Sequence, residues 1–200
     1  MKLFHFIARA EKLMPAEMKK WPWEITDNLE TIILEMIKSF GNEYNITHAL
    51  GIHKTAVIEQ NVIIKGPVII GQNVSIGANA YLRGPVLIDD GVHIGAACEI
   101  KQSIIFSDSA IAHFNYIGNS IIGSNVNFEA GAVAANHYNE RFNKIISVLY
   151  GDEIINTGVK KFGSLVGDGC KIGANAVLSP GTILNKNYLV KRLELVEQVK

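Results

Sequence analysis

The sequence of 200 residues is poor in cysteine: it has only Cys98 and Cys170, and neither belongs to a CxxC pair. Two isolated cysteines exclude a disulfide framework, so both are expected to pack in the core as small apolar residues. The chain also lacks an excess of either charge, because Lys plus Arg and Asp plus Glu number 19 each. A balanced charge favours neither nucleic acid nor a membrane surface as a partner.

Long apolar runs are absent as well. No stretch of eighteen apolar residues occurs, and the apolar run near the N-terminus stops at Arg9. A membrane span needs about that length, and MKLFHFIARAEKLMPAEM has too short an apolar core for a signal peptide. We therefore expect a cytoplasmic protein. A length of 200 residues with 48% hydrophobic residues predicts about one domain with a sizeable core.

What the sequence does contain is a repeat of six residues. From residue 52 to residue 100 every sixth position is aliphatic, and the residue four places further on is small or apolar. The aliphatic positions are Ile52, Ile58, Ile64, Ile70, Ile76, Leu82, Ile88, Ile94 and Ile100, and the repeat returns at Val166, Ile172, Leu178 and Leu184. Such hexapeptides are typical of a parallel β-helix, in which six residues form one short strand and one corner.

The regions outside the repeat suggest the domain organisation. In residues 1–48 the apolar positions from Ile25 to Phe40 follow helical spacing and Gly41 ends the run, which predicts an amphipathic helix after a shorter one around residues 8–12. We expect this helical cap to cover the open end of a β-helix that spans 49–188. Residues 135–163 leave the repeat and predict a hairpin excursion around Gly151. The tail, 189–200, is compatible with strand or helix.

Three sixes per turn would stack residues eighteen apart at about 4.8 Å. The columns expected after the aliphatic positions are Lys65, Arg83 and Lys101; Glu59, Gly77, Gly95 and His113; and His53, Gly71, Asp89 and Ser107. At about 5 Å and an effective dielectric near 20, each neighbouring pair of cations in the first column repels by roughly 3 kcal/mol, and by much less when exposed. This column is therefore either a solvated edge or a site for an anion such as phosphate.

The count of six breaks in AHFNYIGNS, residues 112–120. Counting on from Ile100 predicts two units of five residues there, AHFNY and IGNSI. A shortened unit re-aims the side chains beside it, and these include His113 and Tyr116. A single histidine on a strand is either a structural residue or a general base. The nearby tyrosine and cation column favour the second reading.

The run YLRGPVLIDDGVHIGAACEIKQSIIFSDSAIAHFNYIGNSIIGSNVNFEAGAVAANH resembles the hexapeptide acyltransferases. It is most similar to the acetyltransferase half of the bifunctional N-acetylglucosamine-1-phosphate uridylyltransferase/glucosamine-1-phosphate acetyltransferase, and to related sugar-phosphate nucleotidylyltransferase C-terminal domains. The resemblance covers about residues 50–190. It implies an all-β fold, a left-handed parallel β-helix, here with an N-terminal helical cap. It also implies acetyl-CoA as acyl donor, an amino-sugar 1-phosphate as acceptor, and a homotrimer.

The resemblance also implies site residues. The catalytic positions would be His113 as general base, Tyr116 and Asn136; the acceptor would be bound by Arg83, Lys101, Asn127 and Lys144; the coenzyme would contact Ala130 and Ala174. The chain departs from the family at three of its positions. His137 stands where a tyrosine is usual, Ala174 replaces a serine, and Lys144 is assigned from an altered loop, NERFNK.

Two other functions stay open. A non-catalytic trimeric module that binds sugar nucleotides or supports assembly would also use this fold, and the altered loop favours it. A zinc hydratase would need three histidines at one metal, but His93 and His113 fall at different positions of the repeat and His137 lies in the excursion. Nucleotidylyl transfer is not expected, because no glycine-rich nucleotide loop precedes the repeat.

Overall fold

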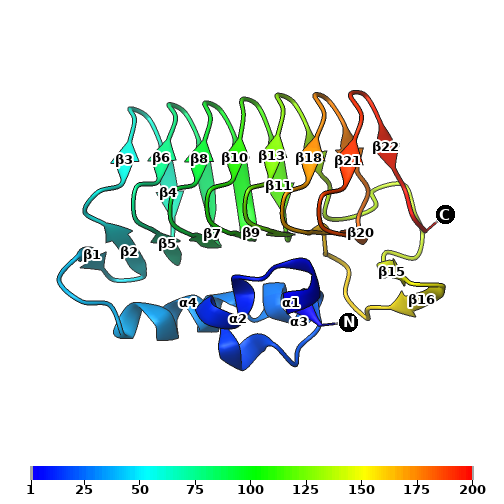
Figure 1. Cartoon of the computed structure of the whole chain (residues 1–200), viewed down its shortest axis with the longest axis horizontal. Helices are drawn as coiled ribbons and strands as arrows, with labels where there is room; N and C mark the ends of the chain where they lie inside the picture. The colour runs from blue at the N-terminus through cyan, green and yellow to red at the C-terminus, as the bar shows by residue number, and fades with distance from the viewer. Residues whose placement is uncertain (1, 200) are drawn as a thin grey trace.

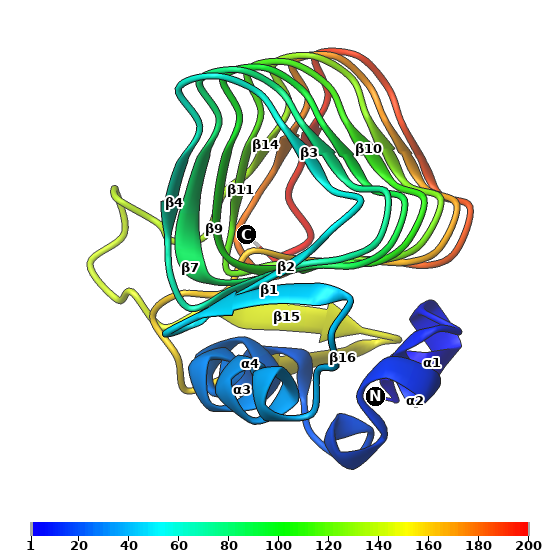
Figure 2. The same ribbon diagram turned by 90° about the vertical axis from the view of Figure 1, so that its left-hand side faces the viewer.

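The structure, a computed structural model, describes residues 2–199. The repeat folds as a left-handed parallel β-helix of triangular cross-section, with helices and a hairpin beside it (Figures 1 and 2). Each coil contributes one strand to each of three faces, and strands of successive coils pair in parallel. The aliphatic residues of the sixes point inward and form a continuous core along the axis. The repeat therefore predicted the fold correctly.

The faces are named here in chain order around one coil. Face one holds β3 (Val57–Ile58), β6 (Ser75–Ile76), β8 (His93–Ile94), β10 (Ala110–Ile111), β13 (Asn127–Phe128), β18 (Lys171–Ile172) and β21 (Leu189–Val190). Face two holds β4 (Ile63–Lys65), the first halves of β7 (Tyr81–Ile88) and β9 (Glu99–Ile105), β11 (Tyr116–Gly118), β14 (Val133–Ala134), β19 (Val177–Leu178) and β22 (Leu195–Val196). Face three holds β2 (Leu50–His53), β5 (Val68–Ile70), the second halves of β7 and β9, β12 (Ile121–Ile122), β17 (Ser164–Val166) and β20 (Thr182–Leu184).

The helical cap lies along face three rather than over the open end that the sequence analysis expected (Figure 2). Its elements are α1 (Leu3–Phe6), α2 (Ala10–Leu13), the 3-10 turn η1 (Pro15–Glu17), α3 (Pro22–Asp27) and α4 (Leu29–Lys38). The reason is that face three is apolar outside as well as inside. Its outward residues Ile69, Leu87, Ile104, Ile121 and Leu165 form a second core with the cap. Antiparallel β1 (Tyr44–Thr47), not a helix, pairs with the first strand of this face.

The single amphipathic helix expected from Ile25 to Phe40 is two helices. Asn28, with φ −96° and ψ 9°, leaves helical geometry between α3 and α4. Its backbone N–H donates to the carbonyl of Glu24 and so closes α3. The chain turns at this residue, and Ile33 and Ile37 of α4 pack in the core against face three.

The count of six shifts earlier than predicted. Arg83 pairs with Lys101, but Val86 pairs with Ser103, because two residues form this corner in one coil and Gln102 alone forms it in the next. The five-residue units are therefore IKQSI and IGNSI; AHFNY belongs to the full unit IAHFNY. Two predicted columns change as a result. Ala112, not His113, follows Gly95, and Phe106, not Ser107, follows Asp89.

The excursion leaves and re-enters the β-helix at this same corner, between faces two and three. Within it β15 (Ser147–Tyr150) and β16 (Glu153–Asn156) form an antiparallel hairpin with Gly151 at the turn, in the left-handed region at φ +64°. The β-helix also runs past the boundary expected at residue 188. Strands β21 and β22 add one more rung to faces one and two, so the tail contains two short strands and no helix among its described residues.

Candidate active site

The cation column predicted on face two is present. Lys65, Arg83 and Lys101 occupy equivalent positions of successive coils, and Gly118 follows them. Arg83 does not project freely, because its guanidinium pairs with Glu99. Lys65 Nζ and Arg83 Cζ lie 5.2 and 5.6 Å from the centroid of the Tyr81 ring. An aromatic face and a carboxylate therefore offset part of the repulsion between these cations.

A further cation, Lys161, reaches this column from the returning limb of the excursion. The limb is fixed by two backbone hydrogen bonds, Phe162 N–H to the Asn136 carbonyl at 3.0 Å and Gly163 N–H to the Asn119 carbonyl at 2.9 Å. Burial lowers the pKa of Lys101, and the positive charges of Lys161 and Arg83 lower it further against the opposing effect of Glu99. Cations held together in this way form a site for an anion.

Tyr116 and Asn136 meet beside the cations, over Gly118. A methyl group on Gly118 would lie 2.5 Å from Tyr116 Oη and 2.9 Å from Asn136 Nδ2, so only glycine leaves room for both groups. The buried Asn136 amide donates to Asn119 Oδ1 at 2.7 Å. Burial raises the pKa of Tyr116, and the Glu99 charge adds to this, so the phenol is neutral and able to donate a hydrogen bond.

His113 stands at the corner between faces one and two, with its side chain exposed. It precedes Gly118 by five residues of the same coil, so their Cα atoms are at most about 17 Å apart. A small ligand held by the long side chains of Lys101 and Arg83 can span this distance to the imidazole of His113. Among residues 2–199, no protein hydrogen bond holds the His113 ring, so it is free to act on a ligand.

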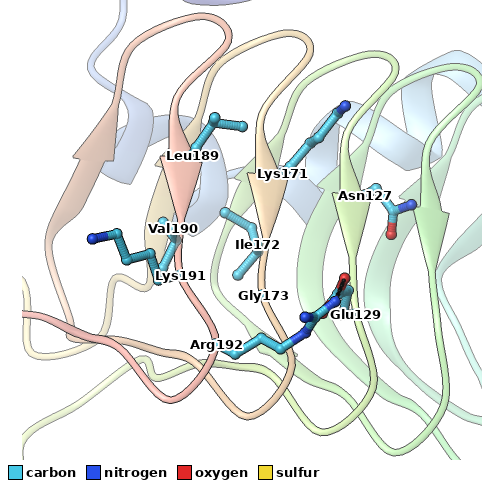
Figure 3. Close-up of a pocket in the computed structure, with 9 residues that line it drawn as sticks. All are labelled: Asn127, Glu129, Lys171, Ile172, Gly173, Leu189, Val190, Lys191 and Arg192. Carbon is cyan, nitrogen blue, oxygen red and sulfur yellow. Dashed lines mark hydrogen bonds and ion pairs between the residues drawn. The ribbon is translucent and has the colours of Figure 1, made fainter.

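The other predicted residues lie on face one or its corner. Asn127 projects from β13 into a cavity of about 510 Å³ (Figure 3). Ala130 and Ala174 follow at the corner of successive coils. Within one chain the predicted site residues thus fall into two separate groups. Arg83, Lys101, Tyr116 and Asn136 gather on face two, whereas Asn127 faces another direction.

Lys144, predicted to bind the acceptor, is held within the excursion. Its ammonium donates to the carbonyls of Tyr138 and Asn139, at 3.1 and 2.8 Å, within the excursion loop. Lys161 stands beside Lys101 instead. No periodicity crosses the excursion, so sequence reasoning missed Lys161; the adjacent pair Lys160–Lys161 just before the repeat resumes was the available signal.

Comparison with known proteins agrees with this architecture. The family model described as the GMPPB C-terminal domain matches residues 64–159, and that described as the hexapeptide repeat of succinyl-transferase matches residues 157–190. This chain is a hexapeptide-repeat protein.

Relatives of this hexapeptide-repeat protein confirm the resemblance to the sugar-phosphate branch. It is 33% identical over 161 residues to the bifunctional sugar-1-phosphate nucleotidylyltransferase/acetyltransferase of Sulfurisphaera tokodaii, covering 65% of this chain and 39% of that one. It is 31% identical to the bifunctional protein GlmU of Methanococcus vannielii, covering 70% and 38%. The chain thus spans about two fifths of these curated relatives. A Bacillus cereus crystal structure described as that of an acetyltransferase has a TM-score of 0.53 at 21% identity, covers 70% of this chain and 71% of its own, and shares the fold.

Two further observations concern residues 2–199. None of their helices is long and apolar enough to cross a membrane. Their histidine, cysteine and carboxylate side chains nowhere group in threes with the geometry of a metal site.

Proposed function

We propose that this protein is an N-acetyltransferase that moves the acetyl group of acetyl-CoA to the amino group of an amino-sugar 1-phosphate. The observation that carries the proposal is the cation cluster of Arg83, Lys101 and Lys161 beside the neutral Tyr116 phenol, one face away from an exposed histidine. Together these groups provide a phosphate anchor, hydrogen bonds for a sugar, and a base.

The chemistry follows from these groups. Arg83, Lys101 and Lys161 hold the phosphate and thereby fix the sugar across face two. Tyr116 and Asn136 supply hydrogen bonds to its hydroxyl groups. His113 takes the proton of the amine as nitrogen attacks the thioester carbonyl, since an imidazole is the side chain best suited to general base catalysis near neutral pH. The carbon–nitrogen bond forms, the carbon–sulfur bond breaks, and the leaving thiolate takes the proton that His113 accepted, so coenzyme A leaves as the thiol.

The division of the site between two faces supports a homotrimer. Asn127 on face one and Tyr116 on face two point in different directions from a triangular prism, so they meet one ligand only if two chains stand side by side. A neighbouring chain would bring its face one against face two of the first. The loop of the excursion that precedes β15, yellow-green in Figure 2, projects beyond face two and would then contact the neighbour.

The activities for which the curated relatives are named support the same reaction. The Sulfurisphaera relative is named for both nucleotidylyl and acetyl transfer, and this chain matches 39% of it. The repeat supplies only the second activity in this proposal. Balanced charge, an ordinary soluble-type composition and the absence of a long apolar run keep the expectation of a cytoplasmic location.

An acetyl-CoA consumption assay over a panel of amino-sugar 1-phosphates tests the proposal, with free glucosamine as the matched acceptor without phosphate. We expect transfer to at least one 1-phosphate and a much lower kcat/KM for the free sugar. No transfer to any of them would refute the proposal. Binding of the sugar phosphate without transfer would instead identify the non-catalytic binding module.

A further inference from the structure

The corner between faces one and two carries a row of backbone N–H groups that point away from the core. Near each end of this row a glutamate accepts the hydrogen bond from the next coil. Ala78 N–H donates to Glu59 at 2.8 Å, and Ala174 N–H donates to Glu129 at 2.9 Å. Both glutamates hold the first corner position of their coil, so each carboxylate reaches the N–H one coil further on.

Between these ends the carboxylate is missing. The corresponding residues are Gly77, Gly95 and Ala112, none of which has an acceptor side chain. As a result, within residues 2–199 the N–H groups of Ala96, His113 and Ala130 lack a protein acceptor. These three donors are spaced one strand apart, about 4.8 Å, and those of Ala96 and His113 border an open groove of about 330 Å³ lined by Gly77 and Gly95. An extended ligand with carbonyl groups would fit such a row.

Cations gather where the row ends. Lys171, Lys191 and Arg192 surround the cavity of about 510 Å³ beyond Asn127, and Figure 3 shows Arg192 turned toward Glu129. The guanidinium contacts both carboxylate oxygens of Glu129, at 2.8 and 2.9 Å. Glu129 therefore occupies two donors at once, the N–H of Ala174 and the side chain of Arg192.

The pair is placed to open. The side chains of Arg192 and Glu129 are 73% and 41% exposed, and exposed ion pairs add little stability. Arg192 and the Ala174 N–H hold the pKa of Glu129 below its usual value, so its carboxylate is charged at neutral pH. A ligand phosphate can replace this carboxylate on Arg192, and a ligand carbonyl can replace it on Ala174. From the coil of His113 to that of Arg192 are three strand spacings, about 14 Å.

We propose that Glu129 is a latch that the acyl donor displaces: the phosphate-bearing end of acyl-CoA takes Arg192, and an amide carbonyl of its pantetheine arm takes the Ala174 N–H. The latch rests on the proposed function, because acyl-CoA is the donor assigned there. It makes Glu129 a specificity-determining residue, since only a ligand with both an anionic end and a carbonyl arm replaces both of its contacts.

Calorimetric titration with coenzyme A tests the arginine contact. In Glu129→Gln the amide oxygen can still accept from Ala174, but the charge that holds Arg192 is gone. We expect the Kd for coenzyme A to fall about threefold to fivefold in Glu129→Gln and to rise in Arg192→Gln. In the Arg192→Gln background, Glu129→Gln should have less than about a twofold effect. The matched control is Glu59→Gln, which removes the same carboxylate charge at the other end of the row, where no arginine is paired with it.

A second probe, adenosine 3′,5′-bisphosphate, separates the two contacts because it has phosphates but no pantetheine arm. Glu129→Ala frees the Ala174 N–H as well as Arg192. Glu129→Ala should therefore increase the affinity for coenzyme A more than Glu129→Gln does. The two variants should increase the affinity for the bisphosphate equally. If the two variants also increased the affinity for coenzyme A equally, the contact with the Ala174 N–H would be contradicted.

The outcomes also separate the latch from the proposed function. Unchanged or weaker binding by Glu129→Gln in a chain that still transfers acetyl groups overturns the latch alone. If neither the wild-type chain nor any variant binds coenzyme A, both the latch and the assignment of the donor fall.

Discussion

Replacing Lys161 by glutamine should weaken binding of the phosphate-bearing acceptor. Lys161 is placed by the two backbone hydrogen bonds of its limb and contributes positive charge beside Lys101. A hydrogen bond to a charged group contributes about 1.5–3 kcal/mol, and the exposure of Lys161 reduces this to about 1–2 kcal/mol. At 1.4 kcal/mol per factor of ten, kcat/KM for the 1-phosphate should fall about 5- to 30-fold.

The assay compares the 1-phosphate with free glucosamine as acceptor. Because the lysine contacts only the phosphate in this account, Lys161→Gln should raise KM for the 1-phosphate and leave the rate with the free sugar unchanged. The matched control is Lys160→Gln, which removes the same charge from an equally exposed neighbour. Lys144→Gln is expected to act through loop stability alone, since its ammonium binds carbonyls of the excursion.

Equal losses of kcat/KM in Lys160→Gln and Lys161→Gln would refute this reasoning, because the effect would then depend on net charge alone. An equal loss with both acceptors would refute it too, since the phosphate would then play no part.

Other expected outcomes follow from the same contacts. Gly118→Ala should lower kcat/KM at least tenfold, because its methyl group would displace Tyr116 or Asn136, with a small change in Tm measured alongside. Burial and neighbouring cations lower the pKa of Lys101, so its charge is lost at lower pH than in an ordinary lysine. Acceptor affinity should therefore decline on raising the pH past that lowered pKa, and Lys161→Gln should move the decline upward. Arg9→Gln should reduce the free energy of unfolding by about 2 kcal/mol in denaturant titrations, because it leaves the buried carboxylate of Asp89 without its partner; Lys38→Gln, at an exposed pair, should change it by less than about 0.5 kcal/mol.

The sequence predicted the β-helix because the inward aliphatic of each six is required by the core. It also contains a signal for the position of the cap. Strands of face three read as continuous apolar runs, such as Val68–Ile70, which is typical of strands buried on both sides. Runs of this kind predict that another layer covers the face, and the helices are that layer.

The corner shift could not be counted from the sequence. Gln102 forms its corner alone in the left-handed region, at φ 47°, where asparagine or glycine would have been the usual signal. Asn119 does the same one coil later and was recognised within IGNSI. The error of one residue placed His113 in the column of Gly77 and Gly95. His113 lies one position after that column, where its backbone N–H belongs to the row of corner N–H groups without a protein acceptor among the described residues.

Only part of the candidate site could be predicted, because the repeat connects some of its residues and not others. Arg83 and Lys101 were placed together because spacing of eighteen holds through their coils. The grouping of Tyr116, Asn136 and Lys161 depends on the return path of the excursion, which has no period, and the pairing of Glu129 with Arg192 spans 63 residues across it. Only coordinates bring these residues together.

The rate of acetyl transfer by His113→Asn, measured with saturating acetyl-CoA and the best amino-sugar 1-phosphate, tests the central claim most directly. Asparagine keeps a polar side chain at the exposed corner but cannot take a proton from the amine. The account predicts a loss in kcat of at least 100-fold, with the Kd for coenzyme A within about threefold of the wild-type value. A variant that retains kcat within about threefold would contradict it, because the transferred proton would then go elsewhere.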